Sequence, residues 1–287
     1  MNKDIFGLNG KAAVVTGGGG ALGGAMALAL AERGAADALL DVREAAAADA
    51  ARHMAATGGR AIGVPCDVLD EKSLADAAAQ VVGEFGRVDI LVNAAGGNVP
   101  AATTSRETVE SGDLHETAGG SDGLKTFFDL DAGAFRSVFD LNVLGTFLAS
   151  RTFGRVMAER GGGVIVNISS MTASRPLTRV PAYSAAKAGV SNFTQWLATH
   201  LAPVHIRVNA IAPGFFLTDQ NRFLLTDEKS GGFSARGTAI IAHTPMGRFG
   251  TGDDLAGALI WLVSDASAFV TGVVIPVDGG FSAYSGI

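Results

Sequence analysis

Short apolar runs alternate with segments of helical pattern through the first third of the chain. The runs of strand length lie at residues 11–16, 38–40, 61–64 and 88–92. Segments rich in alanine and leucine, typical of helices, lie between them at residues 25–33, 44–56 and 73–85. Short strands that alternate with helices predict βαβ units and a parallel sheet. Because crossovers of this kind are right-handed, we expect the sheet to be doubly wound.

The same alternation continues in the rest of the chain. Apolar runs at residues 163–168, 205–211 and 272–277 predict further strands. A helix is expected over residues 253–263, with two aspartates near its start, where the helix dipole favours acids. Apolar helix faces over residues 135–153 and 190–201 predict packing inward or between subunits. We therefore expect residues 1–287 to form a single α/β domain of Rossmann type, with a seven-stranded parallel sheet and helices on both faces.

Composition narrows the class of protein. Hydrophobic residues make up 48% of the chain and charged residues 17%, which is typical of a folded globular protein and not of a disordered one. The net charge of −6 provides no basic surface, so no nucleic-acid partner is expected. No apolar run reaches the roughly eighteen residues that a membrane span requires, so no membrane association is expected.

Cysteine and histidine usage favours a cytoplasmic protein without a metal. Cys66 is the only cysteine, so no intrachain disulfide can form and a reducing compartment is suitable. The N-terminal residues around Asp4 and Gly7 contain no long apolar run and do not resemble a secretory signal. The five histidines are scattered without ligand spacing, and no metal site is expected.

A glycine run at residues 17–20 lies between the first predicted strand and the helix that follows it. Together with Gly23 it satisfies the G-x-G-x-x-G spacing. The helix N-terminus beyond such a loop offers free N–H groups to a pyrophosphate. Asp41 ends the second strand, where a carboxylate accepts hydrogen bonds from ribose hydroxyls and repels a 2′-phosphate. The pattern predicts a dinucleotide site that favours NAD, while the nearby Arg43 leaves NADP possible because it could contact a 2′-phosphate.

Tyr183 and Lys187 are four residues apart in a helical segment, so they stand one turn apart on the same face. A cation near a phenol lowers its pKa from the usual value of about 10, and such a phenol can act as a general acid or base. Ser170, at the end of a predicted strand, could bring a hydroxyl to the same point. Taken alone, such a pair is more often an ordinary aromatic contact and a solvated charge.

These motifs, in this order, resemble the short-chain dehydrogenase/reductase family over nearly the whole chain. Residues 16–23 resemble its T-G-x-x-x-G-x-G cofactor loop, with Ala21 in place of the middle glycine. Residues 93–96 resemble its N-N-A-G element, with Ala94 in place of the second asparagine. The remaining matches are the adenine-contacting pair Asp67-Val68, the helix asparagine Asn142, the serine Ser170, the Y-x-x-x-K of Tyr183 to Lys187, and the P-G-x-x-x-T segment at 213–218.

The resemblance implies a role for each catalytic position. Tyr183 would exchange a proton with the substrate oxygen while hydride passes to or from the nicotinamide, and Ser170 would hydrogen-bond that oxygen. Lys187 would lower the pKa of Tyr183 and bind the nicotinamide ribose, and Asn142 would hold a water on the proton path. The cofactor contacts that it implies are Gly17, Gly19, Gly20, Ala21, Leu22, Asp41, Asp67, Val68, Asn93, Ala94, Ala95, Gly96, Tyr183, Lys187, Pro213, Gly214, Phe216 and Thr218.

Two segments distinguish this chain. Residues 98–126 exceed what the family needs between its motifs, and their polar composition predicts a long loop, either a lid or interface arm or a plain surface insertion. Residues 215–249 occupy the place of the family's substrate-covering segment. Their polar and cationic side chains suit a polar, anionic substrate, because guanidinium binds carboxylate through two parallel bonds. The substrate contacts that we expect are Arg175, Arg179, Asn221 and Arg222.

The insertion, the loop at 169–179, residues 243–250 and residues 278–287 together resemble a narrower branch, the D-mannonate oxidoreductases or fructuronate reductases. This branch would interconvert D-mannonate and D-fructuronate with NAD(H) in carbohydrate metabolism, and the family habit implies a homotetramer. The alternatives are another carbonyl reductase (gluconate 5-dehydrogenase-like, polyol or 3-ketoacyl-acyl carrier) and a non-catalytic dinucleotide-sensing regulator. The acidity of the chain disfavours an acidic carrier protein as partner, and the four filled catalytic positions disfavour a regulator.

Overall fold

The computed structural model describes residues 4–115, 124–218, 222–227 and 231–286. Its centre is a seven-stranded sheet of order β3-β2-β1-β4-β5-β6-β7, in which every neighbouring pair is parallel. The strands are β1 (Ala12–Thr16), β2 (Ala36–Asp41), β3 (Arg60–Pro65), β4 (Ile90–Asn93), β5 (Gly163–Ile168), β6 (Ile206–Pro213) and β7 (Val274–Val277). The order reverses between β1 and β4, as in a Rossmann fold. The predicted fold class is confirmed.

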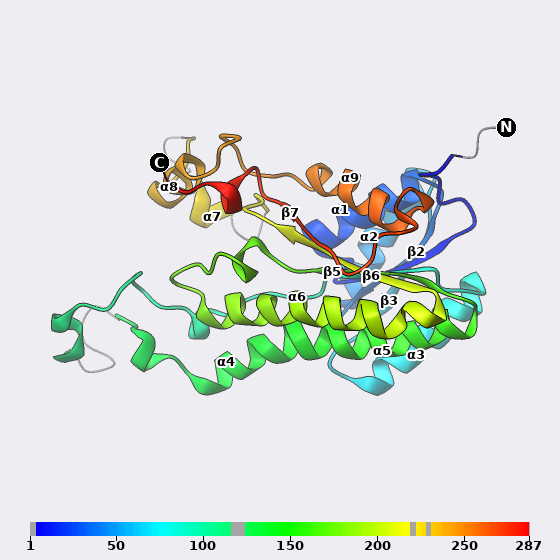
Figure 1. The fold of residues 1–287 in the computed structure, drawn as a ribbon, viewed down its shortest axis with the longest axis horizontal. Helices are drawn as coiled ribbons and strands as arrows, with labels where there is room; N and C mark the ends of the chain where they lie inside the picture. Colours follow the sequence, from blue (N-terminus) through cyan, green and yellow to red (C-terminus); the bar gives the residue numbers. More distant parts are fainter. Residues whose placement is uncertain (1–3, 116–123, 219–221, 228–230, 287) are drawn as a thin grey trace.

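Helices cover both faces of the sheet (Figure 1). One face packs against α1 (Ala21–Glu32), α2 (Glu44–Ala56) and α9 (Asp253–Val263), and the other against α3 (Glu71–Phe85), α5 (Gly145–Glu159) and α6 (Pro181–Leu201). Successive strand residues alternate between the two cores: Val15 belongs to the first and Val14 to the second. Both faces are therefore apolar, which is why the strands appear in the sequence as continuous hydrophobic runs.

The helical pattern predicted over residues 135–153 is divided in the structure. It consists of α4 (Ala132–Phe139), a π-helical turn (Asp140–Leu144) and α5. This π-helical turn matters for function, because such turns are frequent at functional sites. The remaining helices are the short α7 (Arg222–Leu225) and α8 (Ala235–Ala242). Single turns of 3₁₀ helix span Pro100–Ala102, Ser111–His115, Phe127–Asp129, Met171–Ala173, Ala202–Val204, Asp265–Ser267 and Phe281–Ala283.

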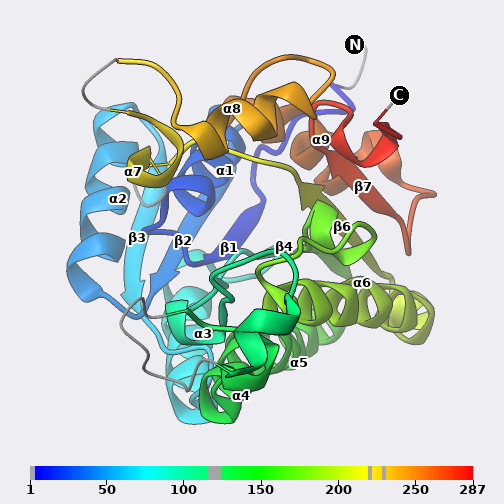
Figure 2. The same cartoon turned by 90° about the vertical axis from the view of Figure 1, so that its left-hand side faces the viewer.

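Two groups of segments flank the carboxyl ends of the strands. Figure 2 shows α7 and α8 on one side of this edge and α4 with the inserted segment on the other. The described part of the insertion, residues 98–115 and 124–126, contains only 3₁₀ turns and irregular backbone, as the polar composition predicted. Within the described residues, no helix is both long and apolar enough to cross a bilayer.

Candidate active site

A cleft of about 510 Å³ opens at the carboxyl edge of the sheet. Its lining combines the glycine-rich loop after β1, the ends of β2, β4, β5 and β6, the start of α6, and one side chain of α8. The cleft includes the point where the strand order reverses, and open α/β sheets bind ligands at such points.

The glycine-rich loop turns sharply to meet α1. Gly17 has φ of +66°, a left-handed conformation that side chains disfavour. A Cβ on Gly23 would lie 2.2 Å from the Gly17 carbonyl oxygen, so α1 can approach the loop only because this position is glycine. Ala21 is the first residue of α1 and has ordinary helical backbone, which explains why alanine is accepted in place of the family's glycine. The helix thus presents its amino end to the cleft.

Asp41 and Arg43 form the end of the cleft next to this loop. The buried Asp41 carboxylate accepts hydrogen bonds from the Arg43 backbone N–H at 3.0 Å and from Arg43 Nε at 3.1 Å. This ion pair raises the pKa of the exposed Arg43 guanidinium. Arg43, which could contact a 2′-phosphate, is therefore already paired with Asp41, the carboxylate expected to bind the ribose hydroxyls.

The end of β4 reaches the cleft through Ala94, Ala95 and Gly96. The Thr16 hydroxyl accepts hydrogen bonds from the backbone N–H groups of Ala94 and Ala95, both at 3.1 Å, and so connects this turn to β1. Asn93 points elsewhere, because its Nδ2 donates to Ser150 Oγ at 2.9 Å and to Asn167 Oδ1 at 2.8 Å inside the protein.

Ser170 and Tyr183 come together at the centre of the cleft. Ser170 lies two residues beyond the end of β5 and caps a 3₁₀ turn, in which its Oγ accepts from the Thr172 N–H at 3.2 Å. Tyr183 lies in the first turn of α6, which begins with Pro181. Burial raises the pKa of Tyr183, while hydrogen bonding to Ser170 lowers it, and the effect of burial is the larger. Both residues line the same cleft, as the sequence predicted.

Lys187 lies one turn further along α6. Its side chain is 4% exposed, and its Nζ donates to the Ile168 carbonyl at 2.7 Å and lies 5.6 Å from the centre of the Tyr183 ring. Burial lowers the Lys187 pKa to about 8. The expectation that the Tyr183 pKa lies below its ordinary value is therefore wrong, because loss of solvent raises it. The Lys187 ammonium group hydrogen-bonds a carbonyl and not the phenol oxygen.

Asn142 is fully buried in the π-helical turn. Its Nδ2 donates to the carbonyls of Gly97 and Val138, at 2.7 and 2.8 Å, and its Oδ1 accepts from the Gly97 N–H at 3.2 Å. A Cβ on Gly96 would lie 2.7 Å from this Oδ1 and 3.1 Å from Lys187 Nζ, so Asn142 and Lys187 meet at the same glycine. The Asn142 side chain thus positions the loop at Gly96 and Gly97. The water that Asn142 is expected to hold remains a prediction.

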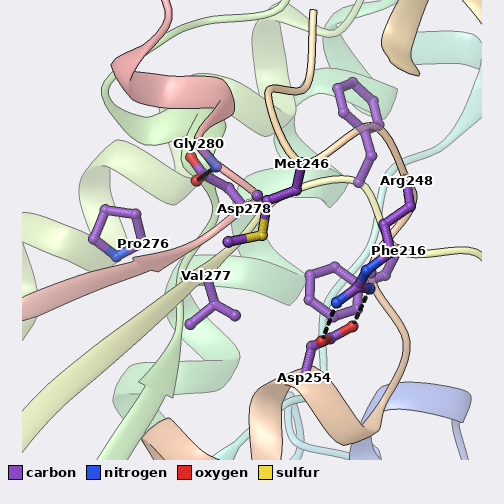
Figure 3. Close-up of a pocket in the computed structure, with 11 residues that line it drawn as sticks. Phe216, Met246, Arg248, Asp254, Pro276, Val277, Asp278 and Gly280 are labelled. Atoms are coloured by element: carbon purple, nitrogen blue, oxygen red, sulfur yellow. Dashed lines mark hydrogen bonds and ion pairs between the residues drawn. The ribbon is translucent and has the colours of Figure 1, made fainter.

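The cleft is also lined by the last residue of β6, Pro213, and by Gly214, Phe216 and Thr218 beyond it, as expected for cofactor contacts. Phe216 also borders a second pocket of about 400 Å³. Figure 3 shows this pocket, in which both guanidinium nitrogens of Arg248 bind the carboxylate of Asp254 at 2.7 Å. This ion pair holds the pKa of Asp254 well below its usual range. A side chain at position 250 would collide with the Phe216 ring, so the glycine there allows the ring to pack at this place.

Four residues expected to contact the cofactor are absent from the cleft lining: Gly19, Asp67, Val68 and Asn93. Gly19 packs against Ala46 of α2, and Val68 packs against Gly145 of α5. The exposed Asp67 carboxylate accepts from the Leu69 N–H at 2.9 Å. The other expected cofactor contacts, from Gly17, Gly20, Ala21, Leu22 and Asp41 through Thr218, lie together in the lining.

The expected substrate contacts are placed differently from the prediction. Arg175 Nε donates to the Ser282 carbonyl at 3.2 Å, and Arg179 Nε donates to the Thr104 carbonyl at 3.1 Å; neither lines the cleft. The two arginines therefore hold the C-terminal segment and the insertion, respectively, against the catalytic loop. Arg222 is exposed in α7 and does not line the cleft, and Asn221 lies outside the described residues.

One cation that sequence reasoning did not select does line the cleft. Arg236 extends from the first turn of α8. Nothing local marks it, since it is one of several arginines between residues 215 and 249. Only the packing of α8 distinguishes it from the others.

Comparison with known proteins relates this arrangement to a family. A sequence profile of the short chain dehydrogenases matches residues 11–229. The chain is 49% identical over 281 residues to an uncharacterized oxidoreductase of Bacillus subtilis, covering 98% of both proteins. It is 33% identical over 284 residues to the 7α-hydroxysteroid dehydrogenase of Escherichia coli strain K12, covering 98% of this chain and 97% of that enzyme. A solved structure of a candidate D-mannonate oxidoreductase from Haemophilus influenzae, with bound NAD, matches with a TM-score of 0.90 and 45% identity over 98% of each chain.

These similarities extend over nearly the whole of each protein, and the profile covers the glycine-rich loop, Ser170, Tyr183 and Lys187. The same residues surround one cleft in the structure. The chain belongs to the short-chain dehydrogenase family and is an oxidoreductase.

Proposed function

We propose that the protein is an NAD(H)-dependent oxidoreductase that interconverts a secondary alcohol and a ketone on a sugar acid, D-mannonate and D-fructuronate being the favoured pair. One observation supports the reaction type above all: Ser170, Tyr183 and Lys187 share a single cleft with a dinucleotide-type glycine loop. The choice of substrate draws on the likeness to the candidate D-mannonate oxidoreductase of Haemophilus influenzae. It also agrees with the polar side chains of the segment at residues 215–249, which borders the cleft.

The residues present fit a dinucleotide. The amino end of α1 and the glycine loop can receive a pyrophosphate, because both line the cleft and glycine at positions 17 and 23 lets the loop turn tightly onto the helix. Asp41 is placed to accept hydrogen bonds from ribose hydroxyls. Because its carboxylate is buried and its negative charge faces the cleft, a 2′-phosphate is disfavoured, which favours NAD over NADP.

A bound nicotinamide supplies hydride transfer to and from the substrate carbon. The side chains of this protein handle the proton and the charge. Tyr183 Oη donates a proton to the ketone oxygen in reduction and accepts it from the alcohol in oxidation. The Ser170 hydroxyl hydrogen-bonds the same oxygen and stabilises negative charge that develops on it. The pKa of Lys187, about 8, is close to neutral pH. Its ammonium group can therefore supply a proton to replace the one that Tyr183 gives up.

A homotetramer in the cytoplasm is part of this proposal. Phe147 of α5 and Phe193, Trp196 and His200 of α6 form a row of aromatic contacts beside an apolar groove of about 470 Å³. Trp196 is 56% exposed, and exposed apolar patches of this kind commonly mark interfaces. The single cysteine, Cys66, is a buried free thiol, which suits a reducing compartment. Light scattering of the purified protein, beside a Trp196→Glu variant, tests the assembly.

The decisive measurement for the function is NADH oxidation by the purified protein with a panel of keto-sugar acids, including D-fructuronate and 5-keto-D-gluconate, and with NADPH in parallel. Turnover of D-fructuronate well above the other substrates is the expected result. Faster turnover of 5-keto-D-gluconate would transfer the assignment to a gluconate 5-dehydrogenase-like activity. No turnover of any sugar acid, with NADH still bound, would refute the substrate class while leaving the family unchanged.

A further inference from the structure

The walls of the cleft differ in their charged groups. At the dinucleotide end, Arg43 is paired with Asp41, and beside the catalytic tyrosine the Lys187 ammonium is bound to the Ile168 carbonyl. The remaining cation in the described lining is Arg236. Within the described residues, its guanidinium forms no hydrogen bond and no ion pair closer than 4.0 Å, although it is exposed to the cleft. A guanidinium at a binding cleft that is not already bound to a carboxylate is suited to an anion.

The position of Arg236 is determined by the packing of α8. Ser234 caps the helix by accepting from the Gly237 N–H at 3.1 Å, and its own N–H donates to the Leu225 carbonyl at 3.0 Å. A Cβ on residue 237 would lie 2.2 Å from that carbonyl oxygen, so glycine allows α8 to sit directly on α7. Ile240, one turn beyond Arg236, is buried with Phe249. Arg236 therefore stands on the helix face that is turned toward the protein body.

Arg236 also lies near the catalytic loop. Partial burial lowers its pKa and the positive charge of Arg179 lowers it further, while Glu107 of the insertion raises it. Arg179 lies between Leu177 and Val180, which line the same cleft just before Tyr183. The charge of Arg179 is thus felt at Arg236, although only Arg236 of the two lines the cleft. The cation is on the substrate side of the cleft and not at the proposed ribose site.

We propose that Arg236 is the residue that binds the carboxylate of the substrate and so makes the enzyme select a keto-sugar acid over the uncharged ketose. A keto-sugar acid carries its carboxylate several carbons from the carbonyl. Its carbonyl can therefore meet Tyr183 and Ser170 while its carboxylate reaches the opposite wall, where a guanidinium can hold it through two parallel hydrogen bonds. Arg179 adds positive potential from behind the loop without entering the cleft. This inference rests on the proposed function, because it assumes that the substrate is an acid.

The test compares two substrates on matched variants. D-fructuronate and D-fructose differ in whether a carboxylate or a hydroxymethyl group occupies the end of the chain, so the ratio of their kcat/KM values reports carboxylate recognition. We expect Arg236→Gln to lower this ratio by about 10- to 100-fold, the range expected when a charged hydrogen bond is lost. Most of the loss should appear as a higher KM for D-fructuronate. Arg236→Lys, which keeps the charge but not the two-pronged geometry, should recover part of it.

Arg175→Gln is the matched control, since it removes a guanidinium that lies outside the cleft lining. Its substrate ratio should equal that of the wild type. The dissociation constant of NADH, measured by fluorescence, and the thermal melting temperature should be unchanged in Arg236→Gln. A weaker affinity for NADH, or equal losses with D-fructuronate and D-fructose, would assign Arg236 to the cofactor or to the fold and overturn the inference.

Failure of the inference can be told apart from failure of the proposed function. If the wild type prefers D-fructuronate and Arg236→Gln keeps that preference, the proposed function stands and Arg236 is not the carboxylate-binding residue. If the wild type shows no preference for the acid over the ketose, the sugar-acid assignment is refuted, and the role of Arg236 is refuted with it.

Discussion

The side-chain amide of Asn142 and the backbone of Gly97 form two hydrogen bonds with each other. Asn142 Nδ2 donates to the Gly97 carbonyl at 2.7 Å, and the Gly97 N–H donates to Asn142 Oδ1 at 3.2 Å. The pair connects the π-helical turn before α5 to the loop that follows β4. Because Gly96 and Gly97 line the cleft, the position of this wall depends on a side chain that does not itself line it.

The first prediction follows from this contact. Asn142→Leu keeps the approximate volume but removes the side-chain partners of the N–H and the carbonyl of the partly buried Gly97. We expect a loss of about 1–3 kcal/mol of unfolding free energy, together with weaker NADH binding. Urea denaturation and NADH titration measure the two effects. Wild-type values in both measurements would show that the loop holds its position without Asn142.

The second prediction concerns Tyr183. Tyr183→Phe removes the proton-transferring hydroxyl but keeps the ring that packs against α4. General acid–base catalysis contributes a factor of about 10² to 10⁴ to the rate, so turnover should fall by this factor or more while NADH still binds. Steady-state kinetics and NADH fluorescence test this. Near-normal turnover in this variant would refute the assignment of Tyr183 as the catalytic acid and base.

The third prediction concerns cofactor choice. Asp41→Ala removes the carboxylate that disfavours a 2′-phosphate and also releases Arg43, which Asp41 binds through Nε at 3.1 Å. We expect the ratio of kcat/KM for NADPH to that for NADH to rise by about tenfold or more, equivalent to about 1.4 kcal/mol. Arg43→Ala, which leaves Asp41 in place, should keep the preference for NADH. A wild type that already prefers NADPH would show that Arg43 decides the cofactor instead.

The fourth prediction concerns Asp37, a fully buried residue of β2 whose carboxyl oxygens have no hydrogen-bond partner in the described part of the chain. Burial raises its pKa from 3.8 to about 8. In the unfolded chain this group ionises near its ordinary pKa, so between these two values the folded protein binds one more proton than the unfolded protein. The contribution of the Asp37 carboxyl group to the free energy of unfolding is therefore fully present at low pH and is lost as the pH rises toward 8.

Asp37→Asn cannot ionise, so it should become progressively more stable than the wild type as the pH increases. The difference in unfolding free energy should grow by up to about 1.4 kcal/mol per pH unit between pH 5 and 7 and level off above about pH 8. Urea denaturation of both proteins at several pH values gives this difference directly. A difference that does not vary with pH would mean that the carboxyl group is ionised, or reaches solvent, in the native protein.

Much of the fold follows from local sequence, for an identifiable reason. Strands such as β1 and β4 are buried on both faces, so their apolar runs are unbroken, and glycines and helical segments separate them clearly. In a parallel sheet the residues that follow the strands gather at one edge, which is why the strand pattern alone predicts that Asp41, Gly96, Ser170 and Phe216 lie together. The first turn of α1 is the exception: Gly23 is a poor helix former, but only glycine permits the approach to Gly17.

The sequence by itself therefore determined the sheet, the glycine loop and the pairing of Ser170 with Tyr183, because each depends on spacing within one element or on the common direction of the strands. Tertiary structure alone decided the rest. Arg175, Arg179 and Arg236 look alike as residues of the chain, yet packing commits the first two to backbone carbonyls and leaves the third at the cleft. The direction of the Tyr183 pKa shift likewise depends on how far the phenol is removed from water, and that is a property of the neighbours that folding brings together.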